Sequence, residues 1–323
     1  MKDTKKLKKI LSSQQFIAGI SLVVLYIYFS ISSPAFRSTS TITSIFDAAY
    51  YIGFLALGVT FVIATGGIDL SLGTGMITSA IIGGLLYQNY GMPVWVSMIV
   101  TLLVGILLGV LNGFLVAKLR IAPFIATLGT QMLMLGLGSI VSKVQTVNFP
   151  LRSSPDGYYK SLFRTDNNFP TGIFIFLGLA LIFYIILNKT KTGRYILSIG
   201  SNEDATRLSG IDVVKWKWRA YIISGFFIGL AGIAYASTYT SITPGLGTGI
   251  ETNAIAAAII GGTSMTGGIA SLLGTVIGVF IMGVLQTGLP FIGLQPHYQI
   301  FITGIVIIVA VYIDVFKRRN DTH

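Results

Sequence analysis

Long stretches without a charged residue are the feature that most constrains how this chain can fold. One helical pass through a bilayer needs about 20 apolar residues, and irregular backbone cannot face hydrocarbon. Several of the stretches are long enough for one transmembrane helix, and two of them are long enough for two or three helices. They are continuously apolar, whereas the strands of a membrane barrel alternate between apolar and polar residues. The stretches without Asp, Glu, Lys or Arg are 10–36, 48–68, 70–117, 121–142, 167–188, 220–250 and 252–313.

The composition narrows the class of protein in the same direction. Charged residues make up only 10% of the chain, whereas a soluble domain carries about a quarter. A net charge of +11 would suggest nucleic acid in a soluble protein, but membrane proteins gather Lys and Arg in cytoplasmic loops. With no Cys and only two His, we expect no disulfide, no metal site and no nucleic-acid partner.

Gly and Pro breaks divide these stretches into about ten predicted helices, which form one all-α transmembrane bundle over residues 1–323. A basic N-terminus ahead of an apolar stretch also fits a cleavable signal peptide. The 27-residue uncharged run is longer than a signal core, however, and favours a retained first helix. The predicted helices are 16–33, 44–64, 70–89, 94–117, 122–142, 171–188, 218–239, 251–264, 269–288 and 298–315.

The basic residues predict the orientation of the chain. With the N-terminus in the cytoplasm and an even number of passes, 17 of the 22 Lys and Arg residues lie in or beside cytoplasmic segments. Both termini and the loop 189–219 are therefore expected on the cytoplasmic side. The longest outer loop, 143–170, is polar and carries three prolines. It reads either as a docking surface for an outside partner or as a passive connection.

The order of the helices indicates an inverted repeat. The second to fifth predicted helices (44–142) and the seventh to tenth (218–315) begin on opposite sides of the membrane. Each half places a glycine, a carboxylate and a small polar residue where its second helix begins, at 66–71 and at 249–253. Repeats with broken helices are a common plan for transporters.

Polar side chains near these breaks are the candidates for a solute path or gate. A carboxylate in the apolar core costs roughly 2.5–3.5 kcal/mol, so Asp69 needs a reason to be there. It either faces a water-filled path with Ser71 or caps the following helix through backbone N–H groups, and capping is the favoured interpretation. The same interpretations apply to Glu251, with Asn253 nearby. Asn112, by contrast, is expected to form a hydrogen bond between two helices.

Glycine is frequent, with 38 residues. Gly105 with Gly109, and Gly225 with Gly229, have the four-residue spacing of helices that approach closely. None of the glycines forms a phosphate loop, because a Walker A sequence needs a Gly-Lys pair and none occurs. Any ATP that drives this protein must therefore be bound by another chain. We expect no cofactor and no catalytic residue on this one, since neither a His pair nor a nucleophile elbow is present.

The loop 189–219 contains a predicted short amphipathic helix. Ser201 or Asn202 can cap it, Glu203 and Asp204 lie in its first turn, and Gly210 ends it. Ala205 and Leu208 are three residues apart and share one face. A helix between two membrane passes is well placed to be pushed by a cytoplasmic partner, although an ordinary basic loop remains the alternative.

Four segments carry a resemblance to a known family. They are ALGVTFVIATGGIDLSLG (56–73), NGFLVAKLRIAPFIATLGT (112–130), TKTGRYILSIGSNEDATRLSGI (190–211) and AIAAAIIGGTSMTGGIASLLGTVIG (254–278). Over about 40–315 the chain resembles the permeases of ribose, xylose, arabinose and galactose ABC importers. The resemblance implies a permease in the bacterial inner membrane that pairs with a second permease, identical or different. It also implies a separate cytoplasmic ATPase and an extracytoplasmic solute-binding protein.

The resemblance makes residues 200–211 the helix that couples to the ATPase. The function it implies is import of a monosaccharide, a ribose-like pentose or a hexose. The alternatives are a nucleoside or other small polar solute, or a stand-alone secondary transporter. The coupling residues it implies are Gly200, Asn202, Glu203, Ala205, Arg207, Leu208 and Gly210.

Overall fold

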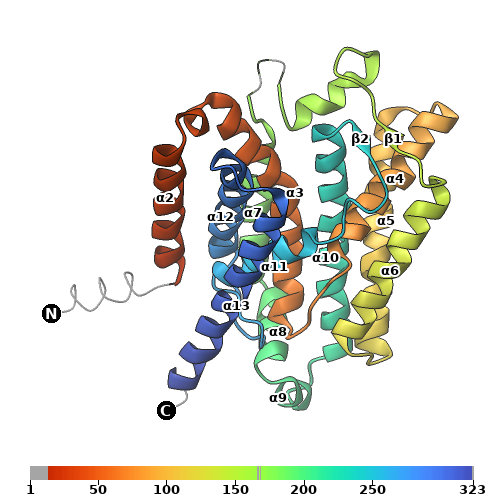
Figure 1. Cartoon of the computed structure of the whole chain (residues 1–323). Coiled ribbons are helices and arrows are strands. Elements are labelled where there is room, and N and C mark those ends of the chain that lie inside the picture. The colour runs from red at the N-terminus through yellow and green to blue at the C-terminus, as the bar shows by residue number, and fades with distance from the viewer. Residues whose placement is uncertain (1–13, 166, 168, 322–323) are drawn as a thin grey trace.

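The computed structural model describes residues 14–321 except 166 and 168, and these form a bundle of long helices (Figure 1). Each of the ten predicted helices is present in this part of the chain, although several begin or end a few residues away from the predicted limits. The long elements are α2 (Gln14–Ser32), α3 (Thr39–Ala64), α4 (Leu72–Tyr90), α5 (Val94–Gly113), α6 (Pro123–Val141), α7 (Gly172–Lys189), α10 (Val213–Thr238), α11 (Ile250–Ile260), α12 (Leu272–Phe291) and α13 (Pro296–Asp321).

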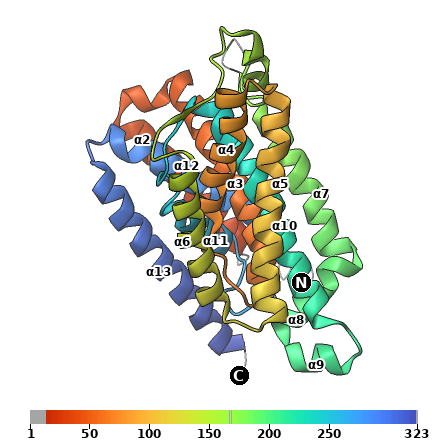
Figure 2. The same cartoon turned by 90° about the vertical axis from the view of Figure 1, so that its right-hand side faces the viewer.

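Short elements close the two ends of the bundle. Helices α8 (Lys191–Ser201) and α9 (Glu203–Leu208) lie at one end in both views (Figures 1 and 2). At the other end, β1 (Val147–Asn148) pairs antiparallel with β2 (Ser241–Ile242). The remaining short helices are η1 (Pro34–Arg37), the π-helical turn η2 (Phe114–Lys118) and η3 (Pro155–Leu162).

Seven helices of the described residues are long and apolar enough to cross a membrane: α2, α3, α5 with η2, α6, α7, α10 and α12. By contrast, α11 has only 11 residues. At 1.5 Å per residue it covers about half of a hydrocarbon core roughly 30 Å thick. It stops early because Gly261 and Gly262 follow it, and Gly262 has φ of +99°. Helix α10 begins earlier than predicted because the Asp212 side chain accepts the Lys215 N–H and caps it.

The predicted inverted repeat is visible as topology. Helix α3 runs toward the α8–α9 end, and α10 runs away from it (Figure 1). Each is followed by a break without helix, residues 65–71 after α3 and residues 239–249 after α10. The second break contains the short strand β2. The first half then continues with α4 to α6 and the second with α11 to α13. Both breaks return the chain to the inside of the bundle before the next helix starts.

Helix α3 forms the centre of the bundle and is buried almost throughout its apolar length. Helices α5 and α10 approach each other at the two predicted glycine pairs. A Cβ built on Gly105 would lie 2.6 Å from the Cα of Gly229, and one on Gly109 would lie 2.8 Å from the Cα of Gly225. Real Cβ atoms essentially never come this close, so glycine is required for the two backbones to touch.

Helix α13 ends at the α8–α9 end of the bundle, and α2 begins in the half nearer to that end (Figure 1). The Gln14 side chain donates to the Ile259 carbonyl at 3.2 Å, and Gln15 donates to the Ser271 hydroxyl at 2.8 Å, so the start of α2 is anchored beside the end of α11. Residues 1–13 and 322–323, where the terminal predictions fall, lie outside the described residues.

Candidate functional site

Asp69 is the hub of a fully buried polar cluster in the first break. Its Oδ1 accepts the backbone N–H of Ser71 at 3.0 Å and the Ser71 hydroxyl at 2.6 Å. Its Oδ2 accepts the hydroxyl of Ser224, on α10, at 3.0 Å. Capping therefore accounts for only one of these bonds. The others come from side-chain hydroxyls, so the carboxylate joins the first break to the first helix of the second half.

Asn112 extends this cluster from α5 to α6. Its amide nitrogen donates to the Ser71 hydroxyl at 2.8 Å, and a longer contact of 3.4 Å reaches Asp69. Its amide oxygen accepts the hydroxyl of Thr130, on α6, at 2.7 Å. The interhelical hydrogen bonds expected of Asn112 are therefore present. Asn112 and Asp69 are both fully buried.

Glu251 occupies the matching place in the second half. It lies in the first turn of α11, and both of its oxygens are 3.1 Å from the N–H of Gly249. Its Oε1 also accepts the side-chain amide of Gln131, on α6, at 3.0 Å. This is the geometry expected of a carboxylate at a helix N-terminus. Asn253 lies half-buried in the same turn and takes no part in the Glu251 bonds.

The N-terminal ends of α4 and α11 meet. Gly73, at the start of α4, lies against Gly247, just before α11, and a Cβ on either would overlap the other's backbone. A Cβ on Gly73 would also come within 2.8 Å of the Glu251 carboxylate. The positive ends of both helices therefore point at the same region of the bundle, with one carboxylate beside each.

The sequence missed two members of the central cluster. Ser224 and Thr130 supply donors to Asp69 and Asn112, yet hydroxyl residues are common throughout the charge-free stretches. Ser224 and Thr130 differ from the other hydroxyl residues only because α10 and α6 bring them close to the first break. Gln131, which donates to Glu251, is likewise selected only by the position of α6.

The predicted amphipathic helix is present as α9. Asn202 caps it by accepting the Ala205 N–H at 2.9 Å, and Gly210 follows it with φ of +77°. Ala205 is exposed, and Leu208 is 89% exposed, so the face they share has no cover from this chain. An apolar side chain left open on a capped helix suits contact with another protein.

Glu203 ties α9 to the start of α10. Its carboxylate pairs with Arg207 at 2.8 Å and with Lys217. Burial would raise the pKa of Glu203, but the hydrogen bonds and charges of Lys217 and Arg207 outweigh it and hold the pKa below its usual value. Helix α9 is therefore fixed to the membrane helix that follows it.

Gly200 connects the α8–α9 segment to the bundle. It lies near the end of α8, and a Cβ there would overlap the carbonyl oxygen of Ala64 and the backbone nitrogen of Gly268. That nitrogen donates to the Ala64 oxygen at 3.0 Å. Ala64 ends α3 immediately before the break that holds Asp69, and Gly268 lies in the loop after α11. One residue of α8 thus contacts both halves of the repeat.

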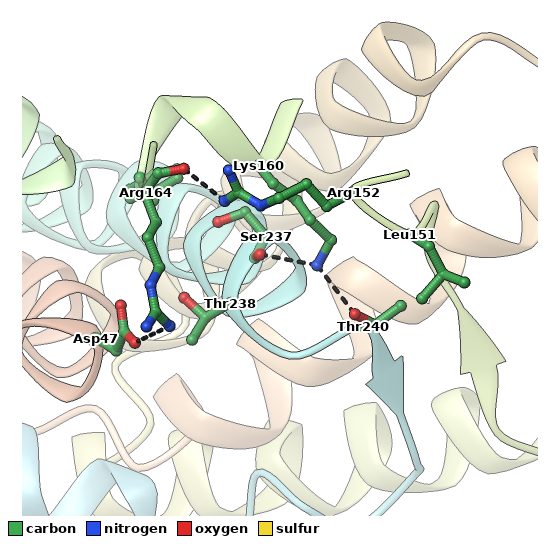
Figure 3. A pocket seen from close by; sticks show the side chains of 9 residues that line it. Asp47, Leu151, Arg152, Lys160, Arg164, Ser237, Thr238 and Thr240 are labelled. Carbon is green, nitrogen blue, oxygen red and sulfur yellow. Dashed lines mark hydrogen bonds and ion pairs between the residues drawn. The ribbon is translucent and has the colours of Figure 1, made fainter. Parts of the chain in front are cut away.

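The outer loop forms a polar pocket of about 300 Å³ with the outer ends of α3 and α10 (Figure 3). Lys160 is buried and donates to the Ser237 carbonyl at 3.1 Å and to the Thr240 hydroxyl at 3.0 Å. Arg164 pairs with Asp47 of α3 at 3.2 Å. Burial, together with the charge of Arg152, lowers the pKa of Lys160. The end of α10 and the residue Thr240 after it therefore hold this part of the loop in place.

Among the described residues, no group of three or more His, Cys, Asp or Glu side chains is placed to hold a metal ion.

Comparison with known proteins agrees with a transport role. A family model described as branched-chain amino acid transport system / permease component matches residues 41–311. The ribose import permease protein RbsC of Bacillus subtilis is 37% identical over 302 residues, covering 91% of both chains. The fructose import permease protein FrcC of Rhizobium meliloti is 34% identical, covering 95% of this chain and 87% of the relative. The L-arabinose transport system permease protein AraH of Escherichia coli is 32% identical, covering 93% and 90%. No solved structure matches significantly.

Proposed function

Because this chain belongs to the permease-component family of the branched-chain amino acid transport system, we propose that it is the membrane-spanning permease subunit of an ATP-driven importer. It is a multi-pass protein of the bacterial inner membrane, with α9 and both termini on the cytoplasmic side. The chain itself carries no nucleotide site. ATP is bound by a separate cytoplasmic ATPase, and an extracytoplasmic binding protein delivers the solute to the side of the outer pocket.

The solute is a monosaccharide, a pentose or a hexose. Relatives named for ribose, fructose and L-arabinose import each cover most of this chain, although the family description names branched-chain amino acids.

One observation carries the mechanism: the contact of Gly200 with both halves of the repeat. The ATPase docks on the exposed face of α9, which is continuous with α8 through Asn202. A push on α9 moves α8, and the Gly200 contact passes that movement to the end of α3 and to the loop after α11. The two breaks are then displaced together, which is the event that alternating access requires.

The test is uptake by reconstituted protein. Proteoliposomes holding this chain, with the ATPase and binding protein encoded beside its gene, are given radiolabelled ribose, fructose or arabinose. We expect accumulation of at least one sugar that requires internal ATP and stops when the ATPase is omitted. Accumulation driven by a proton or sodium gradient in liposomes holding this chain alone would refute the importer. ATP-driven uptake of a nucleoside or an amino acid, but of no sugar, would refute the solute.

A further inference from the structure

The first turns of α10 and the π-helical turn η2 form a groove of about 700 Å³ at the α8–α9 end of the bundle (Figure 1). Its lining combines three cations with apolar surface. The side chains concerned are Lys118 of η2 and Lys215, Trp218, Arg219 and Ile222 of α10. The four on α10 have the spacing of one helix face, so this wall is charged near the start of the helix and apolar further in.

The groove lies at the level where membrane-crossing helices meet water. Helix α10 begins here, and the segment formed by α5 and η2 ends here, and both are long and apolar enough to cross a membrane. Trp216 and Trp218 lie in the first two turns of α10, and tryptophan is enriched at the boundary between membrane and water. Leu111 and Leu107, one and two turns before η2, are exposed as lipid-facing residues are. The groove therefore opens where lipid headgroups lie and continues toward the acyl chains.

Contacts within the chain hold the walls of the groove in place. The indole N–H of Trp218 donates to the Val110 carbonyl of α5 at 3.0 Å. The same ring lies against Gly113, where a Cβ would overlap it. The guanidinium of Arg219 lies 4.3 Å from the centre of the Trp216 ring. Walls that are already fixed lose little conformational freedom when a ligand binds.

The charges in the groove are not balanced by the chain. None of the ion pairs in the described part of the chain includes Lys118, Lys215 or Arg219. One carboxylate, that of Asp212, also lines the groove, and it accepts the backbone N–H of Lys215 as the cap of α10. Three cations and one carboxylate leave the lining with a net charge of +2. Like charges this close to an apolar wall favour the binding of an anion between them.

We propose that this groove, the α10 groove, binds one anionic phospholipid. Its phosphate lies among Lys118, Lys215 and Arg219, and an acyl chain covers Trp218 and Ile222. Phosphate oxygens accept charge-assisted hydrogen bonds from guanidinium and ammonium groups, which are stronger than bonds between neutral groups. Basic pockets between membrane helices bind anionic lipid headgroups by this chemistry.

The apolar wall decides between a lipid and a free phosphate ion. Free phosphate would satisfy the cations but would leave Trp218 and Ile222 uncovered, whereas a phospholipid brings a charged end and an apolar end in the order that the groove presents them. The bound lipid would join η2, at the end of α5, to the start of α10. Nothing in this proposal depends on which solute the chain carries.

Fluorescence quenching by brominated lipid tests the site directly. The test protein is the full chain with Trp95→Phe, which leaves Trp216 and Trp218 as its tryptophans. It is placed in phosphatidylcholine nanodiscs that contain a rising fraction of brominated phosphatidylglycerol or, separately, of brominated phosphatidylcholine. We expect half-maximal quenching at a much lower fraction of the anionic lipid, because its acyl chain lies against Trp218.

Neutral replacements of the cations test the headgroup contact. Lys118→Gln and Arg219→Gln should each weaken the binding of brominated phosphatidylglycerol about fivefold, and the double variant about 25-fold. The matched control is Lys189→Gln, which removes an exposed cation at the end of α7, outside the groove lining, and should change nothing. Lys118→Gln with Lys215→Gln replaces the double variant if Arg219→Gln fails to reach the membrane, since both lysines are exposed.

Four results would overturn the proposal. The first is equal quenching by the two brominated lipids, and the second is a double variant that binds phosphatidylglycerol as tightly as Lys189→Gln does. The third is loss of the preference for phosphatidylglycerol when millimolar inorganic phosphate is added at constant ionic strength, which would make free phosphate the ligand. The fourth is a double variant that loses co-purification of the ATPase while its lipid binding is unchanged, which would assign the groove to a protein partner. The quenching needs neither ATPase nor solute, so its failure is separable from failure of the proposed importer.

Discussion

Gly200→Ala is the sharpest perturbation of the proposed coupling route, because one methyl group is directed at two backbones. The added Cβ would overlap the Ala64 oxygen and the Gly268 nitrogen, and neither is the end of a flexible side chain. Overpacking of this kind costs roughly 1–3 kcal/mol. Separation of the Gly268–Ala64 hydrogen bond costs about 1 kcal/mol more. Better helix propensity returns about 1 kcal/mol, since Ala replaces Gly within α8.

We therefore expect Gly200→Ala to lose about 1–3 kcal/mol of stability and to uncouple ATP hydrolysis from uptake. The matched control is Gly178→Ala in α7, where a Cβ meets nothing within 4 Å. Thermal unfolding in detergent gives the stability, and the ratio of sugar taken up to ATP hydrolysed in proteoliposomes gives the coupling. If Gly200→Ala and Gly178→Ala match the parent in both measurements, the contact neither constrains the fold nor transmits movement.

Three further predictions address α9 and the orientation of the chain. Ala205→Asp should abolish co-purification of the ATPase and uptake while leaving membrane expression unchanged, because a buried unpaired charge in that contact costs a few kcal/mol. Ala205→Ser is the mild control, and an intact complex with Ala205→Asp would exclude this face as the docking surface. The pKa of Glu203 is lowered in the folded protein, so its ion pairs contribute stability at a pH above about 4.5, the ordinary pKa of a glutamate. This contribution is lost as the pH falls through the pKa of Glu203 in the folded protein. Thermal unfolding of the parent should therefore be more acid-sensitive than that of Glu203→Gln, and equal sensitivity would contradict the ion pairs. A Cys at the exposed outer position Ser153 should react with an impermeant reagent only from outside, and labelling only from inside would reverse the topology.

The helices and the cytoplasmic cap could be predicted because both depend on local sequence. Membrane passes follow from runs of apolar residues, and the ends of α9 follow from the preference of Asn202 for a cap and of Gly210 for positive φ. The division of the cytoplasmic loop into two helices, α8 and α9, was missed. A residue that caps one helix can also end the one before it, and Asn202 does both.

The composition of the central cluster could not be predicted. Asp69 stands out because a carboxylate is rare in an apolar stretch, but Ser224 lies 155 positions away and resembles many other serines. The outer pocket was missed for the same reason. Lys160 reaches the end of α10 across 77 positions, and nothing near Lys160 in the sequence signals that contact. The assignment of Asp69, Ser71, Asn112, Glu251 and Asn253 to a path or gate stays a prediction.

The glycine contact between α5 and α10 limits which motions are open to this protein. Many transporters with inverted repeats work by rocking one half against the other. Here α5 belongs to the first half and α10 to the second, and their backbones touch at Gly105 and Gly229 and again at Gly109 and Gly225. Two helices in backbone contact at two successive turns cannot separate without opening a void along the centre of the bundle. Helices α5 and α10 therefore move as one rigid body, and the hinges of any transport cycle lie outside this pair, in the breaks and in the peripheral helices.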